Sequence, residues 1–390
     1  MTIAQDGVLT GPDGVGGHVG WAAVRLAPAP GLADHRGYAA LPEDRRWAEA
    51  GAAELAWLTA LCHTPPAAGH LELRITGGLG GPDGTTGAPL RATLLARAPG
   101  PTPEVAAAAV RALLAVRPPA HVATAPVREH AALLAELDPV GEGAAAPVLY
   151  EIRKRVEVRP LARPTAQRAD AVTAAPFAPA GATRELLWTT LARQPHPTCL
   201  AVTLAPARLP AEAGPAMRRF AESYAVLALP GTGSPLWQGA RRADPSAEAG
   251  RDFFDDALRR YLGPAYRLRI LLASAGPVDP GLPESVAAQV GGVVVPLPPE
   301  QHARARADFT ALGADPLPAT HRPPALPDAN WSLLEHELVG LADQDEAAAA
   351  VRLPYEFTGR TARLFEQLPP VETPLPPPSP VRPAGLPPLI

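Results

Sequence analysis

One lysine is available for chemistry in this chain. Lys154 is the only lysine among 35 basic residues, and the others are arginines. A P-loop needs a lysine directly after a glycine-rich stretch, because its ammonium group binds the phosphates. Lys154 lies instead in Ile152-Arg153-Lys154-Arg155-Val156, with no glycine nearby. These residues therefore exclude a P-loop ATPase within the sequence, and we expect Lys154 to belong to a strand.

Carboxylates gather on one predicted helix. Asp252, Asp255 and Asp256 share a helix face, as paired catalytic carboxylates would. Asp255 precedes Arg259 by four residues, and Asp256 precedes Arg260 by four, which is the spacing of ion pairs along a helix. We therefore interpret this face as solvated and ion-paired.

Metal donors are present, but their spacing does not match a closed site. Cys62-His63 and His196-Pro197-Thr198-Cys199 carry the side chains that zinc prefers, at separations untypical of zinc sites. We predict buried, unreactive thiols. Glu335-His336-Glu337 resembles the start of a metalloprotease helix, but the second histidine position is Gly340. The sequence predicts no metal.

Neither a nucleophile nor a nucleotide loop is indicated. Ser274 ends a predicted strand without G-x-S-x-G around it, which favours a strand-end cap. The glycine clusters at 14–20, 78–83 and 231–236 each miss G-x-G-x-x-G at the sixth position. We interpret all three clusters as turns and predict no cofactor.

Charge argues against a nucleic-acid-coating protein or a polybasic membrane binder. The 35 basic and 39 acidic residues give a formal net charge of −4. The basic cluster Arg153-Lys154-Arg155 is diluted by Glu151 and Glu157. The two cysteines predict no disulfide framework and favour a reducing cytoplasm. The first residues lack a signal-peptide pattern, and no apolar run is long enough to span a membrane.

The elements that must position these residues follow from periodicity and punctuation. The first 45 residues are rich in glycine and proline and predict irregular structure, with one strand near 19–26. Helices are predicted over 46–63, 102–116, 129–137, 183–193, 211–229, 244–262, 282–290, 300–312 and 331–341. Strands are predicted over 71–76, 90–97, 121–127, 150–158, 171–177, 199–204, 266–273 and 293–297.

This interleaving predicts an α+β fold. We expect two sheet-plus-helix sandwich units, each a sheet with helices on one face, and a proline-rich C-terminal tail. The corresponding segments are 1–64 (irregular, then helix), 65–140 (the smaller unit), 148–315 (the larger unit) and 316–390 (helix and tail). The tail includes Pro374, Pro376, Pro377, Pro378 and Pro380, which predict a polyproline II segment that binds a partner.

The order of segments from 148 to 355 resembles the N-terminal accessory region of large bacterial motor ATPases of the HerA/FtsK type. The stretches that carry the resemblance are 150–157, 191–197, 266–277 and 347–354. In that family the last stretch leads through a proline-rich connector into the motor, whereas this sequence stops at Ile390 without a Walker lysine. The resemblance implies a partner-docking or ring-organising module, either a separate subunit or a truncated form.

The sequence therefore predicts a non-catalytic scaffold or adaptor that docks to a HerA/FtsK-like ATPase or another large bacterial complex. Two alternatives stay open. One is an enzyme whose acidic and arginine residues converge only in the fold. The other is a module that faces nucleic acid through arginines clustered on one surface.

Overall fold

The described part of the chain is a mixed α+β fold, as the sequence predicts. The computed structural model describes residues 2–3, 7–28, 32, 35, 37–65, 69–79, 89–141, 148–165, 168–178, 185–230, 243–297, 299–313, 332–355 and 363–368. Prolines 374, 376, 377, 378 and 380 of the predicted tail lie outside these residues. Among the described helices, none is long and apolar enough to cross a bilayer.

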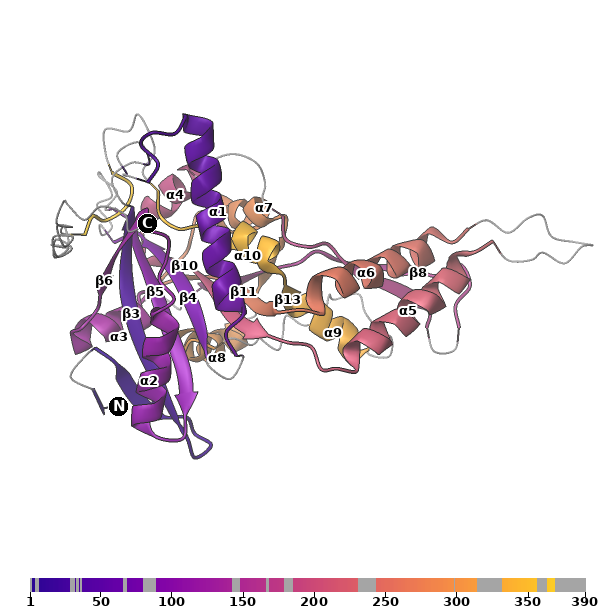
Figure 1. The fold of residues 1–390 in the computed structure, drawn as a ribbon, viewed down its shortest axis with the longest axis horizontal. Coiled ribbons are helices and arrows are strands. Elements are labelled where there is room, and N and C mark those ends of the chain that lie inside the picture. The colour runs from indigo at the N-terminus through magenta and orange to yellow at the C-terminus, as the bar shows by residue number, and fades with distance from the viewer. Residues whose placement is uncertain are drawn as a thin grey trace, which may run out of the picture.

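One antiparallel sheet of eleven strands organises the body (Figure 1). Nine strands follow the order β1-β2-β3-β5-β4-β10-β11-β7-β12, while β6 also pairs with β3 and β13 with β11. Their bounds are β1 Thr2–Ile3, β2 Leu9–Pro12, β3 His18–Pro28, β4 His70–Gly77, β5 Arg91–Gly100, β6 Val122–Pro126, β7 Val148–Arg153, β10 Thr198–Ala207, β11 Ala265–Ser274, β12 Val293–Pro296 and β13 Leu341–Ala342.

The pairing of β4 with β10 joins the segments 65–140 and 148–315 into this one sheet. Thr198 lies opposite Gly77, and the register runs to Leu204 opposite Leu71. The first 45 residues contribute β1, β2 and β3, which is more regular structure than predicted. Their glycines serve the turn between β2 and β3, where Gly14 and Gly16 adopt positive φ angles of 82° and 100°.

Helices cover both faces of the sheet, although a single covered face was expected. The larger apolar cluster holds side chains from α1, α2, α4, α7 and α10, whereas α3 and α8 supply the clusters of the opposite face. The bounds of these helices are α1 Glu43–Cys62, α2 Pro103–Leu114, α3 His130–Leu137, α4 Glu185–Ala192, α7 Gly281–Val290, α8 Pro299–Thr310 and α10 Gln344–Ala350.

The second covered face explains the fully buried strand β4. Its alternation of apolar and polar residues predicts a strand with one wet face. Leu71, Leu73 and Ile75 indeed pack into the larger apolar cluster. The polar residues between them, Glu72 and Arg74, are also buried, because α3 and α8 lie over them.

A second small sheet and two long helices form an arm that projects from the body (Figure 1). The sheet consists of β8 (Val156–Pro160) and β9 (Asp170–Ala174), and the helices are α5 (Ala213–Ala228) and α6 (Pro245–Tyr261). Helix α9 (Leu333–Gly340) lies at the base of the arm. The single strand predicted over 150–158 is wrong, because the chain leaves β7 at Lys154 and enters the other sheet as β8.

Candidate functional site: the projecting arm and its buried junction

Three connections at one end of the large sheet give rise to the arm. β7 ends at Arg153 and continues into β8, β10 ends at Ala207 and leads to α5, and α6 leads into β11 at Ala265. Because β7 and β10 both run antiparallel to β11, the ends of β7 and β10 and the start of β11 lie at the same end of the sheet. The arm is therefore one structural feature built from two stretches that are separate in sequence.

The arm has a hydrophobic core of its own. Helices α5 and α6 approach closely at Gly250, where an added Cβ would lie 2.8 Å from the Tyr224 ring. Phe254 stacks on Phe220 with ring centroids 4.9 Å apart. Ala171 of strand β9 belongs to the same cluster. The buried members are Leu161, Ala171, Ala207, Ala213, Met217, Ala221, Tyr224, Ala228, Ala247, Phe254, Ala257, Tyr261, Ala265, Leu338 and Leu341.

Polar side chains fasten the arm's layers to each other. Arg168 donates to the Tyr224 hydroxyl at 2.6 Å and to Glu335 of α9 at 2.7 Å. Its guanidinium carbon also lies 4.6 Å from the Phe220 ring centroid. Asp244 caps α6 by accepting from the Ser246 amide, and its other oxygen accepts from the amide of Ala162 after β8. The arm is thus held as a unit.

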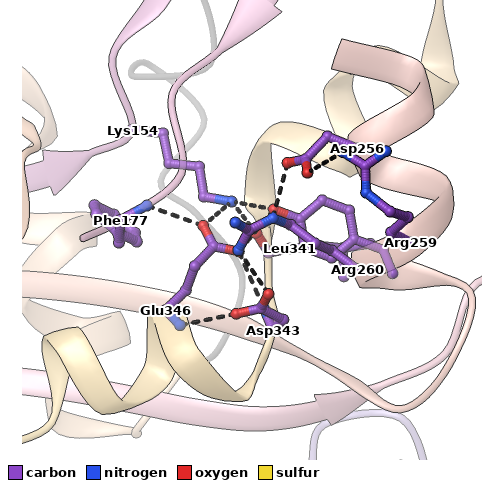
Figure 2. Close-up of polar contacts among 9 residues, drawn as sticks. Lys154, Phe177, Asp256, Arg259, Arg260, Leu341, Asp343 and Glu346 are labelled. Atoms are coloured by element: carbon purple, nitrogen blue, oxygen red, sulfur yellow. Dashed lines mark hydrogen bonds and ion pairs between the residues drawn. The ribbon is translucent and has the colours of Figure 1, made fainter. Parts of the chain in front are cut away.

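Lys154 lies at the junction between arm and body, fully enclosed by polar partners (Figure 2). Its Nζ lies 2.6 Å from Glu346 Oε1 and donates to the Tyr261 hydroxyl at 2.8 Å and to the Leu341 carbonyl. An ammonium group has three protons, and these partners satisfy all three. Since Tyr261 ends an arm helix and Glu346 belongs to α10 of the body, the contacts join the two parts.

The Glu346 carboxylate is the centre of this junction. Oε1 also accepts from the Phe177 amide at 3.0 Å, while Oε2 accepts from the Tyr261 hydroxyl at 2.7 Å and the Asp343 amide at 3.1 Å. The Glu346 amide in turn donates to Asp343 Oδ1 at 2.8 Å, which completes a capping box at the start of α10. One carboxylate therefore links four chain segments, its own included.

An outer layer of charges surrounds this centre. Arg260 of α6 contacts Asp343 at 2.7 Å and Asp256 at 2.8 Å, and Arg259 donates to Asp256 at 3.0 Å (Figure 2). The predicted pair of Asp256 with Arg260 is confirmed, but that of Asp255 with Arg259 is wrong. Arg259 bonds to Asp256 instead, which is one residue closer along the helix.

Burial decides the protonation chemistry at the junction. Desolvation lowers the pKa of Lys154, and the facing Glu346 carboxylate opposes that effect. Desolvation, followed by the charge of Glu346, raises the pKa of Tyr261. The geometry is that of an internal ion pair with a bridging hydroxyl. Its groups are turned to one another, so the arrangement is suited to holding two parts of the fold together.

The structure separates the residues that the sequence offered as metal donors or a nucleophile. Cys62 packs in the larger apolar cluster, whereas Cys199 belongs to a cluster on the other face of the sheet. Within the described residues, no three His, Cys, Asp or Glu side chains are grouped to hold a metal. Ser274 is buried at the end of β11 and bonds to the Thr198 hydroxyl at 2.9 Å. That contact ties adjacent strand ends.

The Glu335-His336-Glu337 stretch is used structurally. Glu335 forms a capping box with Ser332 at the start of α9 and pairs with Arg168, while Glu337 pairs with Arg267. Of the glycine clusters, 14–20 forms the turn from β2 and the start of β3, which confirms the interpretation as a turn there. The second cluster is described only for Gly78 and Leu79, and the third lies outside the described residues.

Two further charge clusters escaped the sequence analysis. Glu72 bonds to Arg74 at 2.6 Å beneath α3 and α8, and Arg269 pairs with Asp308 nearby. The i, i+2 spacing of Glu72 and Arg74 on one strand face is the local signal that could have revealed the first pair. The second cluster unites Tyr355 with Glu54 and with His121, whose Nε2 lies 3.2 Å from the hydroxyl. Sequence offers no local signal for it.

The junction was also missed, although its lysine was singled out. The basic cluster Arg153-Lys154-Arg155 does not act as one patch, because Lys154 is buried and Arg153 pairs with Glu151 at 3.0 Å. Comparison with models of known families and with curated proteins finds no match for the chain.

Proposed function

We propose that this chain is a non-catalytic adaptor that binds a partner protein through its arm and its proline-rich tail. The observation that carries the proposal is the arm itself. It has its own core, leaves one end of a sheet that is covered on both faces, and is attached through a buried junction. An arm attached in this way presents its surface at a fixed angle to the body.

The use of the charged side chains supports a binding role over a catalytic one. Lys154, Glu346 and Tyr261 satisfy one another, and Arg74 donates to main-chain carbonyls of two helices. These side chains bond to other groups inside the protein. An active site instead needs side chains that face a substrate. The rival hypotheses of a hidden enzyme and of an arginine-based nucleic-acid module stay predictions.

The partner that we propose is a HerA/FtsK-like motor ATPase. Support comes from the segment order over 148–355, which resembles the accessory region of such motors. The stretch 347–354 that carries part of this resemblance corresponds to the end of α10 and the buried residues after it. We propose that the chain acts on the motor in trans, with the arm and the tail as its two contacts.

A capture experiment tests this function. The tagged full chain is used to recover proteins from its native lysate, and P-loop ATPases are identified by mass spectrometry. Val226, near the end of α5, has 68% of its surface exposed, and Val226→Asp should abolish recovery if the arm binds the motor. Val105→Asp on α2 is the matched control, since Val105 is 46% exposed on the body.

A truncation to residues 1–368 separates the tail from the arm in the same experiment. Loss of the motor on truncation assigns the tail as a contact, and equal recovery assigns the contact to residues 1–368 alone. If the full chain recovers no P-loop ATPase, the proposed partner is wrong. Recovery that survives Val226→Asp as well as Val105→Asp removes the arm from the interface.

A further inference from the structure

One stretch of chain leads from the arm junction to the beginning of the proline-rich tail. β13 pairs with β11 at the base of the arm, and Asp343 and Glu346 then start α10 at the junction. After α10, Val351 and Leu353 are buried in the larger apolar cluster. The described chain resumes at 363, immediately before the tail. Residues 341–355 and 363–368 are therefore called the connecting segment.

Both ends of the connecting segment are anchored by specific contacts. At its start, Glu346 bonds to Lys154 and Tyr261. At its end, Glu366 pairs with Arg91 at 3.1 Å and its amide donates to the Leu90 carbonyl at 2.9 Å. Between them, the Tyr355 hydroxyl bonds to Glu54 of α1, against which α10 packs.

Aromatic packing strengthens the anchor beside the tail. Phe365 is almost completely buried, and its ring lies 6.1 Å from that of Trp188 on α4 in an edge-to-face arrangement. The Leu90 amide donates to the Leu364 carbonyl at 2.8 Å. The last described residues before the tail are thus held by the same apolar cluster that holds α10.

We propose that the connecting segment couples the arm to the root of the tail, so that binding at the arm changes the stability of the contacts at residues 364–366. The inference deepens the proposed function, on which it rests for what binds the arm. The physical reason lies at the junction. A buried ion pair with four bonded segments cannot loosen gradually, because each partner left alone would be a charge or donor without compensation.

Packed helices connect the two anchors, because α10 contacts α7, α7 contacts α4, and Trp188 of α4 lies against Phe365. Val351 follows α10 directly, and its amide donates to the Ala347 carbonyl at 2.8 Å. Ala347 and Ala350 are buried in the larger apolar cluster. Because this packing is close, α10 moves as a rigid unit if the contacts of its first turn are broken. Tyr355 would then move relative to Glu54, and the shift of α10 against α7 would reach Phe365 through α4 and its Trp188 ring.

Hydrogen exchange on the isolated full-length chain tests the coupling without any partner. Tyr261→Phe removes only the hydroxyl that accepts from Lys154 and donates to Glu346. We expect amide exchange to become at least threefold faster at Leu90 and Glu366, which report the anchor beside the tail. Asp252→Asn is the matched control on the same helix, because Asp252 is exposed and, among the residues that the structure describes, pairs with its neighbour Arg251.

The reverse measurement makes the test decisive, since a coupling free energy is reciprocal. Glu366→Gln should accelerate exchange at the Phe177 and Asp343 amides, both of which donate to Glu346, by a similar factor. If either variant changes exchange only around its own site, the coupling is wrong. If Tyr261→Phe unfolds the chain, the Glu366→Gln measurement decides alone. A failed capture of the motor leaves these rates unaffected, so the two proposals fail separately.

Discussion

Arg74 and Glu72 lie two residues apart on β4 and face each other in the interior, with Nε and Oε1 separated by 2.6 Å and both side chains fully buried. The remaining donors of Arg74 reach the main-chain carbonyls of Glu136, Leu137 and Phe309. Those carbonyls lie in the last turns of α3 and α8, where helices lack their own donors. One guanidinium therefore closes two helix ends over the sheet.

Replacing Arg74 by methionine should destabilise the fold by about 3–5 kcal/mol, because Glu72 would remain as an uncompensated buried charge. Urea unfolding followed by circular dichroism measures the change. Arg159→Met is the control, since Arg159 pairs with Glu157 on the exposed face of β8, and its loss should cost less than about 1 kcal/mol. Equal costs for the two variants would contradict the assigned role of Arg74.

The junction predicts a non-additive pair of substitutions. Lys154→Met leaves Glu346 without its counter-ion and should cost about 3–5 kcal/mol. The double variant Lys154→Met with Glu346→Gln should recover more than half of that loss, because no charge then stays buried. A double-mutant cycle in urea measures the interaction. Additive costs would mean that the two side chains act independently.

Two helical glycines should respond to alanine in opposite directions. Gly250→Ala places a Cβ against the Tyr224 ring, so we expect a destabilisation of about 1–3 kcal/mol. Gly51 lies in α1 with open space around it, and Gly51→Ala should stabilise by about 0.5–1 kcal/mol. Thermal unfolding of both variants gives the answer, and a stabilising Gly250→Ala would show that the arm helices are less closely packed.

His70 should make the fold sensitive to acid. Burial lowers its pKa from 6.5 to about 4, while its Nε2 donates to the Leu312 carbonyl at 2.6 Å. The unfolded chain therefore takes up the proton first, and stability falls as the pH drops from about 6.5 to about 4, by about 3 kcal/mol in total. Below that range this contribution is constant.

The variant His70→Gln isolates this effect from that of the carboxylates. Urea unfolding at several pH values should show a flatter dependence for the variant than for the natural chain over that interval. The difference between the two curves should level off on the acid side. Parallel curves would mean that His70 is protonated equally in both states.

Both thiols should resist modification until the chain unfolds. Burial raises the pKa of Cys62 to about 11 and that of Cys199 to about 12. Since the thiolate is the reactive form, a thiol reagent near neutral pH should react at least about a hundredfold more slowly than in denaturant. Absorbance of the released product measures the rate. Fast reaction of one thiol in the folded chain would place it at an accessible surface.

Local signals were sufficient for most helices. Thr102 and Asp244 precede proline and acidic residues at helix starts, and both cap helices as such patterns indicate. The short helix α10 was not predicted, although Asp343 and Glu346 have the spacing of a capping box. The four alanines that follow, residues 347–350, show no helical spacing of apolar and polar residues. The capping-box spacing was therefore not interpreted as the start of a helix.

The sites could not be predicted in the same way, because their partners are distant in sequence. Tyr261 lies 107 residues from Lys154 and 85 from Glu346. Phe309 lies 235 residues from Arg74. The alternation of apolar and polar residues on β4 predicts that one face of the strand is polar. Only the fold determines whether water or the ends of two helices cover that face. The single lysine was a usable signal for a special position, without naming its partners.

The enclosure of Lys154 also determines how a complex of this protein is to be mapped. Reagents that bridge lysine ε-amines have one target here, and folding removes it from their reach. Carboxylate-activating chemistry at exposed positions such as Glu222 and Asp252 suits the arm instead. The same holds for enzymes that acylate lysine or conjugate another protein to it. They would find their substrate only in a chain whose junction has opened, so such a mark would record past unfolding.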